Sequence, residues 1–335
     1  MKKRMLRAAA VVLTPLLIFG GCGGGQAQEE YHLEESNKLV VYTSHMEEIY
    51  GPIVREFEER TGIWVEVVTG GTNDLLDRIR EEDGKNSGDV MFGGGVDSLN
   101  AYGEYFEPYC SSQSEHLDDT YASPDGVYTV FSRLPIVIVY NKKLVISAGT
   151  PRSWRDLTNN HWQGSIAFAG PDRSGSSYTA LMTMLQILSE DMSEEEVMEA
   201  FVSNLDGDIL SGSGEVLGEV TAGKKLIGIT LEETVLKEMD QNADIAMIYP
   251  REGTAAVPDG SALIKNAPNR ENAELFLEFT VSEDVQRLLE DRLYRRSVRK
   301  GAEGEEIREV LYDLDYSEKH REEILTEWKE LTQQE

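Results

Sequence analysis

The sequence predicts an α/β protein built from two strand–helix sets. Short runs of β-branched residues alternate with amphipathic helical stretches, which is the pattern of βαβ units and of a mainly parallel sheet. The chain has 335 residues, more than a single hydrophobic core usually accommodates, so two lobes are expected. Its only two cysteines, Cys22 and Cys110, exclude a disulfide framework if the first of them is lipidated.

The N-terminus has the layout of a bacterial export signal. "MKKRMLR" carries four positive charges and precedes the apolar stretch "AAAVVLTPLLIF" and then "GGC". We therefore expect residues 1–22 to be a lipoprotein signal peptide with Cys22 as the lipidated residue, and residues 23–36 to be a flexible tether. The alternative is ordinary signal cleavage nearby. Either way, the protein is expected outside the cytoplasmic membrane, as a membrane-anchored lipoprotein or in the periplasm.

The first set alternates strands and helices from residue 38 onward. A helix is expected at 51–62 because Pro52 lies near its start and Gly62 just past its end. The strands on either side of it are short and rich in Val and Ile, as strand interiors usually are. The elements expected in this set are strands at 38–43, 63–69 and 89–92, and helices at 51–62 and within 70–82.

A long apolar run at 131–145 is expected to be a strand that leaves one lobe and enters the other. The extended stretch at 243–266 can cross back, so Arg133–Tyr140 and Ile248–Gly253 are the candidate crossings. The further elements expected are strands at 165–170 and 226–230, and helices at 174–190, 192–205, within 211–224, at 269–291 and at 321–333. The expected domains are residues 37–138 plus 250–335 for lobe 1, and residues 139–249 for lobe 2.

The charge of the chain excludes some partners. A formal net charge of −29 argues against binding to nucleic acid or to an anionic membrane surface. It also favours cationic ligands, unless local geometry overrides the overall field. Much of the acid lies in helical runs such as "SEEEVMEA", where solvated helix faces are the expected role.

Segments that follow strands and lead into helices are rich in Ser, Thr and Gly. In open α/β sheets ligands bind beyond the carboxyl ends of the strands, where helix N-termini offer free N–H groups to an anion. Capping is the alternative role for each loop taken alone. The five segments are Thr43–His45, Gly70–Thr72, Gly93–Gly95, Ser174–Ser177 and Ser211–Gly214.

Catalytic and metal signatures are not found in the chain. Neighbouring residues of an extended chain point to opposite faces, so Ser44 and His45 do not form a nucleophile–base pair. The sequence contains no G-x-S-x-G, H-E-x-x-H, C-x-x-C or G-x-x-x-x-G-K motif, and its five histidines are scattered. We therefore expect no enzyme activity, no cofactor and no metal site. For His45, a hydrogen-bonded residue at the rim is the alternative to a ligand contact.

Several long motifs resemble one group of transport proteins. The motifs are "LVVYTSHMEEIYGPIVREFEERTGIWVEVV", "DVMFGGGVDSL", "GTPRSWRDL", "WQGSIAFAGPDRSGSSYTALMTML" and "YPREGTAAVPDGSALIKNAPNRENAELFLEF". They resemble bacterial ABC-transporter solute-binding proteins of the two-domain branch for ferric iron, 2-aminoethylphosphonate or hexose phosphates. The resemblance implies a two-lobe periplasmic-binding-protein-like fold with hinge strands and C-terminal helices, which closes on its ligand and docks on permease subunits.

The resemblance also bears on the ligand. Ferric-binding members use a His in the first loop, where His45 stands, and two adjacent tyrosines. None of the fourteen tyrosines here are neighbours, and Glu232 and Glu233 stand in the corresponding region. Ferric iron prefers hard anionic donors such as phenolates, so iron is the less favoured ligand. A small phosphorylated organic solute, such as a sugar phosphate or phosphonate, is expected instead.

By the same resemblance, Ser44, Thr72 and Ser174 to Ser177 would hold the phosphate, while His45, Asp206 and Glu232 would face hydroxyl groups of the ligand. Asp208 and Glu233 are equally near alternatives to the two acids. The alternative role for Glu232 is that of a first-turn helix acid that offsets the helix dipole. Other readings left open are aminoethylphosphonate, ferric iron, a polyamine, and a sensor subunit that presents its ligand to a membrane histidine kinase. The expected ligand-binding residues are Thr43, Ser44, His45, Thr72, Gly94, Ser174, Ser176, Ser177, Asp206 and Glu232.

Overall fold

A computed structural model describes residues 37–333 except 83, 84, 86, 124, 147, 148, 242 and 303–306. Cys22 and the expected signal peptide and tether therefore lie outside the described residues. Three parallel strands begin the fold, and their bounds are β1 (Lys38–Thr43), β2 (Trp64–Thr69) and β3 (Val90–Gly95). Their carboxyl ends lie at one edge of the sheet, as expected for parallel strands joined by helices.

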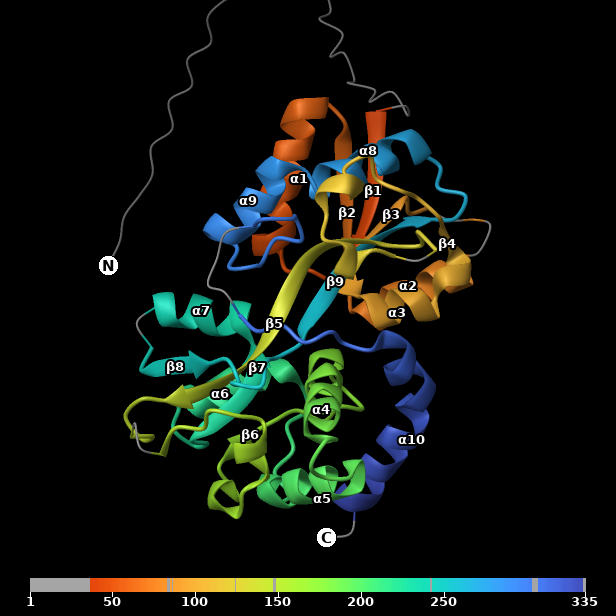
Figure 1. Ribbon diagram of the computed structural model, residues 1–335. Helices are drawn as coiled ribbons and strands as arrows, with labels where there is room; N and C mark the ends of the chain where they lie inside the picture. Colours follow the sequence, from red (N-terminus) through yellow and green to blue (C-terminus); the bar gives the residue numbers. More distant parts are fainter. Residues whose placement is uncertain are drawn as a thin grey trace, which may run out of the picture. The chain divides into compact units, whose positions relative to one another are not determined.

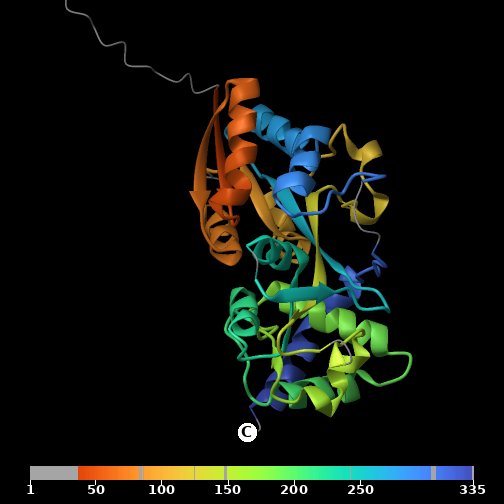
Figure 2. The ribbon, with the colours of Figure 1, turned by 90° about the vertical axis from the view of Figure 1, so that its left-hand side faces the viewer.

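Helices cover both faces of this sheet. On one face lie α1 (Glu47–Thr61), α8 (Arg270–Thr280) and α9 (Glu283–Arg292), and on the other lie α2 (Thr72–Glu81) and α3 (Val96–Ala101). Figure 2 shows α1 lying along β1 and β2. These elements, together with the short strand β4 (Phe106–Glu107), form what we call the first lobe. Its two apolar cores lie on opposite faces of the sheet.

The second lobe is built around β6 (Ile166–Ala167), β7 (Ile227–Leu231) and β8 (Ile245–Ile248). Strands β6 and β7 are parallel, so their carboxyl ends also meet at one edge. One face packs against α4 (Gly175–Leu188) and α5 (Glu194–Leu205), and the other against α6 (Val216–Thr221) and α7 (Glu232–Asp240). Helix α5 begins with a capping box between Ser193 and Glu196, which satisfies two backbone N–H groups.

Two long antiparallel strands run from one lobe into the other (Figure 1). Strand β5 (Thr129–Asn141) pairs with β9 (Ala256–Ile264) in its first half and with β7 and β8 in its second half. The first crossing therefore lies where the sequence predicts it. The second crossing is the beginning of β9, a few residues after the expected Ile248–Gly253. The predicted α/β architecture with hinge strands is confirmed.

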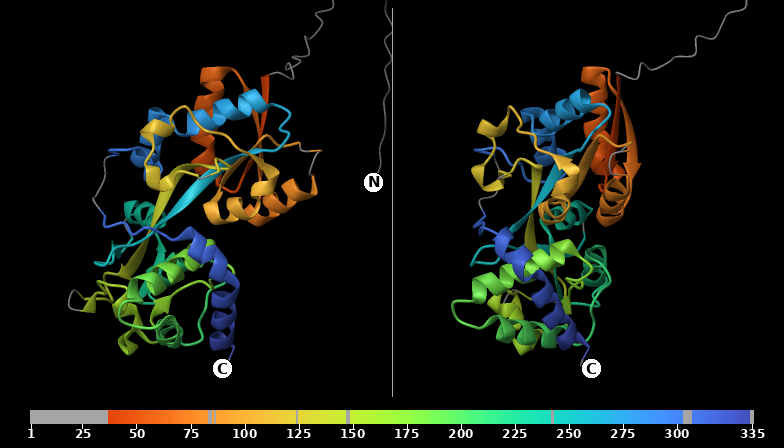
Figure 3. Two further views of the ribbon diagram at one scale, coloured as in Figure 1. Left: turned by 45° about the vertical axis from the view of Figure 1, so that its right-hand side comes forward. Right: turned by 90° about the vertical axis from the view of Figure 1, so that its right-hand side faces the viewer.

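The last helix, α10 (Leu314–Thr332), packs on the second lobe. Its buried Ile324 and Trp328 belong to the same core as α4 and α5, and Figure 3 shows the helix beside them. The domain ranges expected from the sequence stay a prediction, and they assign this helix with residues 250–335 to the first lobe. The expected single helix at 269–291 is two helices, α8 and α9, separated at Val281 and Ser282. No helix within the described part of the chain is both long and apolar enough to cross a membrane.

Truncation of Trp328 tests the docking of α10. The side chain is 2% exposed, so Trp328→Ala leaves a large cavity and should lower the free energy of unfolding by about 3–5 kcal/mol. Lys329→Ala is a matched control, because this neighbour in α10 is exposed and should change the value by less than about 0.5 kcal/mol. Urea unfolding measures both values. Equal stability of the two variants would show that α10 is not packed as described.

Candidate functional site

The carboxyl ends of β1, β2 and β3 bring four of the expected site residues together. Thr43 is fully buried, and its hydroxyl donates to the carbonyl oxygen of Phe92 (2.7 Å), which ties the end of β1 to β3. A Cβ on Gly94 would lie 3.0 Å from the methyl group of Thr72, so these two residues touch. Ser44 is half-buried in the same turn. All four residues therefore lie at the carboxyl-end edge of the first-lobe sheet.

His45 belongs to a buried polar cluster. Its Nε2 lies 2.8 Å from Oδ2 of Asp259 in β9, and the same oxygen accepts from Nη1 of Arg295 (2.5 Å). The other oxygen of Asp259 accepts from the backbone N–H of Gly94 (2.9 Å). The ring lies against Gly93, where any Cβ would come within 2.5 Å of it, so only glycine fits there. Three chain segments are thus joined through one carboxylate.

Burial lowers the pKa of His45, although the Asp259 carboxylate acts in the opposite direction. Arg295 already neutralises that carboxylate, so an imidazolium would gain little from it. Burial would raise the pKa of Asp259, but the hydrogen bond from His45, the charge of Arg295 and the Gly94 amide lower it below its usual range. His45 is therefore neutral, with the proton on Nε2 donated to Asp259. Its Nδ1 is a buried acceptor with no partner among the described residues.

Three serines converge at the N-terminus of α4. The hydroxyl of Ser174 accepts from the backbone N–H of Ser177 (3.3 Å) and from its hydroxyl (3.0 Å), and lies 3.2 Å from the hydroxyl of Ser176. α4 has no acid in its first turn, whereas every other α-helix in the described ranges has at least one. The partial positive charge at this helix end is thus not offset by a carboxylate of its own first turn.

Glu232 and Glu233 begin α7, at the carboxyl end of β7. Glu232 accepts two bonds from Arg296, at 2.8 Å each, and a further bond from the hydroxyl of Tyr249. Glu233 lies 3.0 Å from Nε of Arg295, and burial raises its pKa. Both acids are paired with arginines of the first lobe. In this arrangement Glu232 is 3% exposed and its oxygens are occupied by protein groups.

Asp206 is not brought to this edge. It forms the left-handed C-cap of α5, and its Oδ1 accepts from the side-chain amide of Gln163 (3.1 Å). Gly164, which approaches the same carboxylate, precedes β6. Asp206 therefore lies near the amino end of that strand, whereas Ser174 follows its carboxyl end. The sequence that follows α5 did not show at which end of β6 the side chain of Asp206 would lie.

Three residues of the cluster were not expected from the sequence: Asp259, Arg295 and Arg296. Their partners are distant in the chain, as in the contact between His45 and Asp259, which are 214 positions apart. One signal was present in the sequence. Asp259 is the only charged residue in the strand run "AVPDGSALI", and a buried carboxylate needs a partner.

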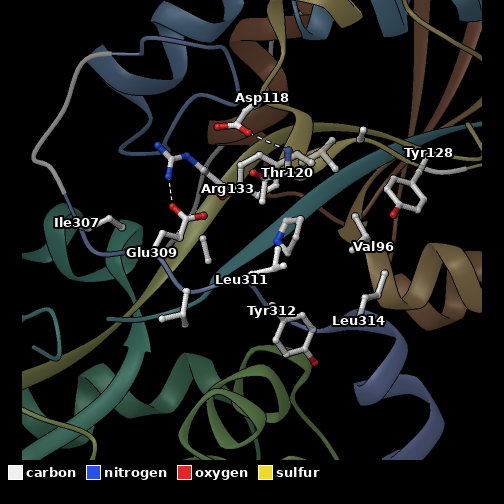
Figure 4. A pocket seen from close by; sticks show the side chains of 16 residues that line it. Val96, Asp118, Thr120, Tyr128, Arg133, Ile307, Glu309, Leu311, Tyr312 and Leu314 are labelled. Atoms are coloured by element: carbon white, nitrogen blue, oxygen red, sulfur yellow. Dashed lines mark hydrogen bonds and ion pairs between the residues drawn. The ribbon is translucent and has the colours of Figure 1, made fainter. Parts of the chain in front are cut away.

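Two cavities lie between elements of the two lobes. One, of about 570 Å³, is bounded by α2, α3 and α10, and its wall residue Asn73 directly follows Thr72. The other, of about 510 Å³, lies beside β5 and β9 (Figure 4). Arg133, which follows a β-bulge between Val130 and Ser132, lines this second cavity and pairs there with Glu309. No group of three or more His, Cys, Asp or Glu side chains arranged for a metal ion occurs in the described segments.

Comparison with protein families identifies a match over most of the chain. Residues 101–309 match the model of the family described as bacterial extracellular solute-binding protein. Iron uptake protein A1 of Synechocystis is 26% identical over 284 residues, which cover 80% of this chain and 77% of that protein. A putative 2-aminoethylphosphonate-binding periplasmic protein of Salmonella typhimurium is 22% identical and covers 69% of this chain and 68% of its own length.

A solved structure shares the fold. The periplasmic binding protein AfuA from Actinobacillus pleuropneumoniae, with exogenous fructose-6-phosphate bound, superimposes with a TM-score of 0.76 at 22% identity. The match covers 89% of this chain and 99% of that protein. The predicted periplasmic-binding-protein-like fold is confirmed, as is the predicted resemblance to the iron, aminoethylphosphonate and hexose-phosphate branch.

The neutral, buried state of His45 predicts a pH effect on stability. Its pKa in the folded protein lies below the ordinary 6.5, so the unfolded chain binds more protons below that pH. Its contribution is fully present above pH 6.5 and is lost as pH falls. His45→Gln, which cannot titrate, should therefore lose less stability than the parent between pH 7.5 and 5.5, as measured by urea unfolding. The exposed control His161→Gln should behave like the parent, and identical pH slopes for all three proteins would contradict the buried neutral state.

Proposed function

Because the chain belongs to the bacterial extracellular solute-binding protein family, we propose that it captures a small phosphorylated organic solute, such as a sugar phosphate or a phosphonate. Members of the family are solute-binding transport proteins, not enzymes, and the family implies a small-molecule ligand and ABC permease subunits as partners. Such proteins act outside the cytoplasmic membrane. Lipidation at Cys22, which would hold the protein at the membrane surface, is part of the proposal.

The observation that carries the ligand class is the serine turn of α4. Ser176 is half-buried, and its hydroxyl stands beside Ser174 at a helix end that has no acid in its first turn. Hydroxyls, free backbone N–H groups and the helix dipole together suit the oxygens of a phosphate or phosphonate. In a chain with a net charge of −29, a first turn without acids repels an anion less than the acid-bearing first turns of the other described helices.

The first lobe would supply the opposing contacts. Ser44 and Thr72 lie at the carboxyl ends of β1 and β2, the edge where α/β sheets receive ligands. Gly94 keeps the backbone close to Thr72. We assign Ser44 and Thr72 to the phosphate, which they would contact together with the serines of α4. His45 is part of the proposed site; its Nδ1 is a buried acceptor without a protein partner within the described residues, so a ligand reaches it only if the surrounding side chains move.

Ferric iron is less favoured by the same residues. A trivalent cation needs several anionic donors that are free to approach it. Glu232 and Glu233 are paired with Arg296 and Arg295, and His45 donates to Asp259. Some relatives are named as iron uptake proteins and others as aminoethylphosphonate-binding proteins. Membership of the family therefore does not decide the ligand, which requires a direct measurement.

Thermal shift of the purified protein tests the ligand class. Glucose 6-phosphate, fructose 6-phosphate, glycerol 3-phosphate, 2-aminoethylphosphonate, spermidine and ferric citrate would each be added at one concentration. We expect a rise in Tm with one or more of the four phosphorylated or phosphonate compounds, since a ligand that binds only the folded state stabilises it. A rise only with ferric citrate or only with spermidine would contradict the proposal.

Replacement of a serine at each end of α4 localises the anion. Ser176→Ala removes a hydroxyl from the proposed site, and we expect the Kd of the stabilising ligand to rise about tenfold, as for a lost hydrogen bond to a charged group. Ser189→Ala is the matched control, because Ser189 is the exposed C-cap of the same helix and should leave Kd unchanged. Calorimetric titration measures both variants. Equal Kd values in the two would remove Ser176 from the site.

A further inference from the structure

Helix α7 of the second lobe is attached to the first lobe by a pair of adjacent acids. Glu232 meets Arg296 in a bidentate contact, and Glu233 meets Arg295 at 3.0 Å. Both arginines follow α9, whose Val285 and Leu289 lie in a core of the first lobe. α7 itself packs through Val235 on the sheet of the second lobe. These four charged residues, which we call the α7 clamp, therefore join the two lobes directly.

The arginine segment is fixed in place by backbone pairing. The N–H of Arg133 donates to the carbonyl oxygen of Arg296 (3.0 Å), and the N–H of Arg296 donates back to Arg133 (3.3 Å). The segment thus runs along the crossing strand β5 like a short strand, and adjacent side chains of an extended segment point in opposite directions. Arg295 reaches the His45–Asp259 cluster, while Arg296 reaches Glu232 and Tyr249. One segment therefore links α7 to the ligand-facing edge of the first lobe.

Burial makes the α7 clamp strong but reversible. The side chains of Glu232 and Arg296 are 4% and 14% exposed, and separation of a buried ion pair costs far more than separation of a surface pair. Arg295 has a second partner, Asp259, within its own lobe. If α7 moved away, Arg295 would stay paired and Glu233 would enter water. Opening would therefore leave no unpaired buried charge at Arg295.

The outer contacts of α7 are weaker. Lys237 pairs with Glu48 of α1, and the side chains of both are about half exposed, at 41% and 45%. The hydroxyl of Tyr294 donates to Asp240 at 2.9 Å, also at an exposed position. Exposed pairs of this kind contribute little to stability. The energy that holds α7 against the first lobe is concentrated at its first turn.

We propose that Arg295 and Arg296 are positioning residues that hold α7, and with it the second lobe, against the first lobe before any ligand arrives. A ligand that contacts both lobes then meets a site that is already assembled. The apparent affinity for this ligand rises with the fraction of the protein in which the two lobes are already in contact. This proposal rests on the ion pairs and does not depend on the proposed solute.

Distance measurement by electron spin resonance tests this proposal. Cys22→Ser and Cys110→Ser remove the native thiols, and Glu59→Cys on α1 and Glu199→Cys on α5 carry one spin label in each lobe; both labelled positions are exposed. Ligand-free protein is then compared with Glu233→Gln and Arg296→Lys. We expect longer and broader distance distributions in both variants than in the parent. Lys237→Gln, on the same helix but in an exposed pair, should reproduce the distribution of the parent.

Two outcomes would overturn the proposal: unchanged distances in both Glu233→Gln and Arg296→Lys, or an equal lengthening in Lys237→Gln. Far-UV circular dichroism and cooperative urea unfolding separate opening from loss of the fold. If Glu233→Gln did not fold, Arg296→Lys, which keeps the charge but loses the bidentate geometry, would decide the question. The distances are measured without ligand, so a failure of the phosphorylated-solute proposal would leave this result unaffected.

Discussion

The contact between Arg295 and Asp259 is the interaction on which the rest of the site depends. Asp259 fixes His45 through Nε2 and the β3 backbone through the amide of Gly94, and its charge is balanced by Arg295. Burial lowers the pKa of His45, and because Arg295 balances the carboxylate, the imidazole remains uncharged. Because the same arginine also meets Glu233, the ends of the first-lobe strands are connected to the second lobe. The geometry of the strand ends, the contact between the lobes and the protonation state of His45 therefore all depend on this one buried ion pair.

Much of the fold could be predicted from local patterns in the sequence. Strand β1 and the end of α1 at Gly62 follow from β-branched runs and from glycine at a left-handed C-cap, and both depend only on neighbouring residues. The packing partner of α10 could not be predicted in this way. The helical pattern around Trp328 identifies an apolar face but not the lobe that buries it. The lobe that buries this face is decided by the path of the chain segment that precedes α10.

The site was predictable where the chemistry is local. The serines of α4 follow a strand and begin a helix, so their convergence at one helix end could be expected. Asp206 shows the opposite case, because a polar residue after a helix can reach either end of the next strand, and it reaches the amino end of β6. The pairing of Glu232 with Arg296 was also hidden, since it joins residues 64 positions apart across two lobes. Charges that neutralise each other at such separations leave no periodic signal in the sequence.

Hydrogen–deuterium exchange with and without glucose 6-phosphate tests most directly whether one solute contacts both lobes. The account predicts that ligand slows exchange at the first turn of α4 and, in the same sample, at the turns after β1 and β2. The C-terminal half of α10, which is remote from both turns in sequence and packs on the core of the second lobe, should be unaffected. Protection confined to one lobe, or protection only around the cavity beside Arg133 and Glu309, would contradict a site shared by the two strand-end edges.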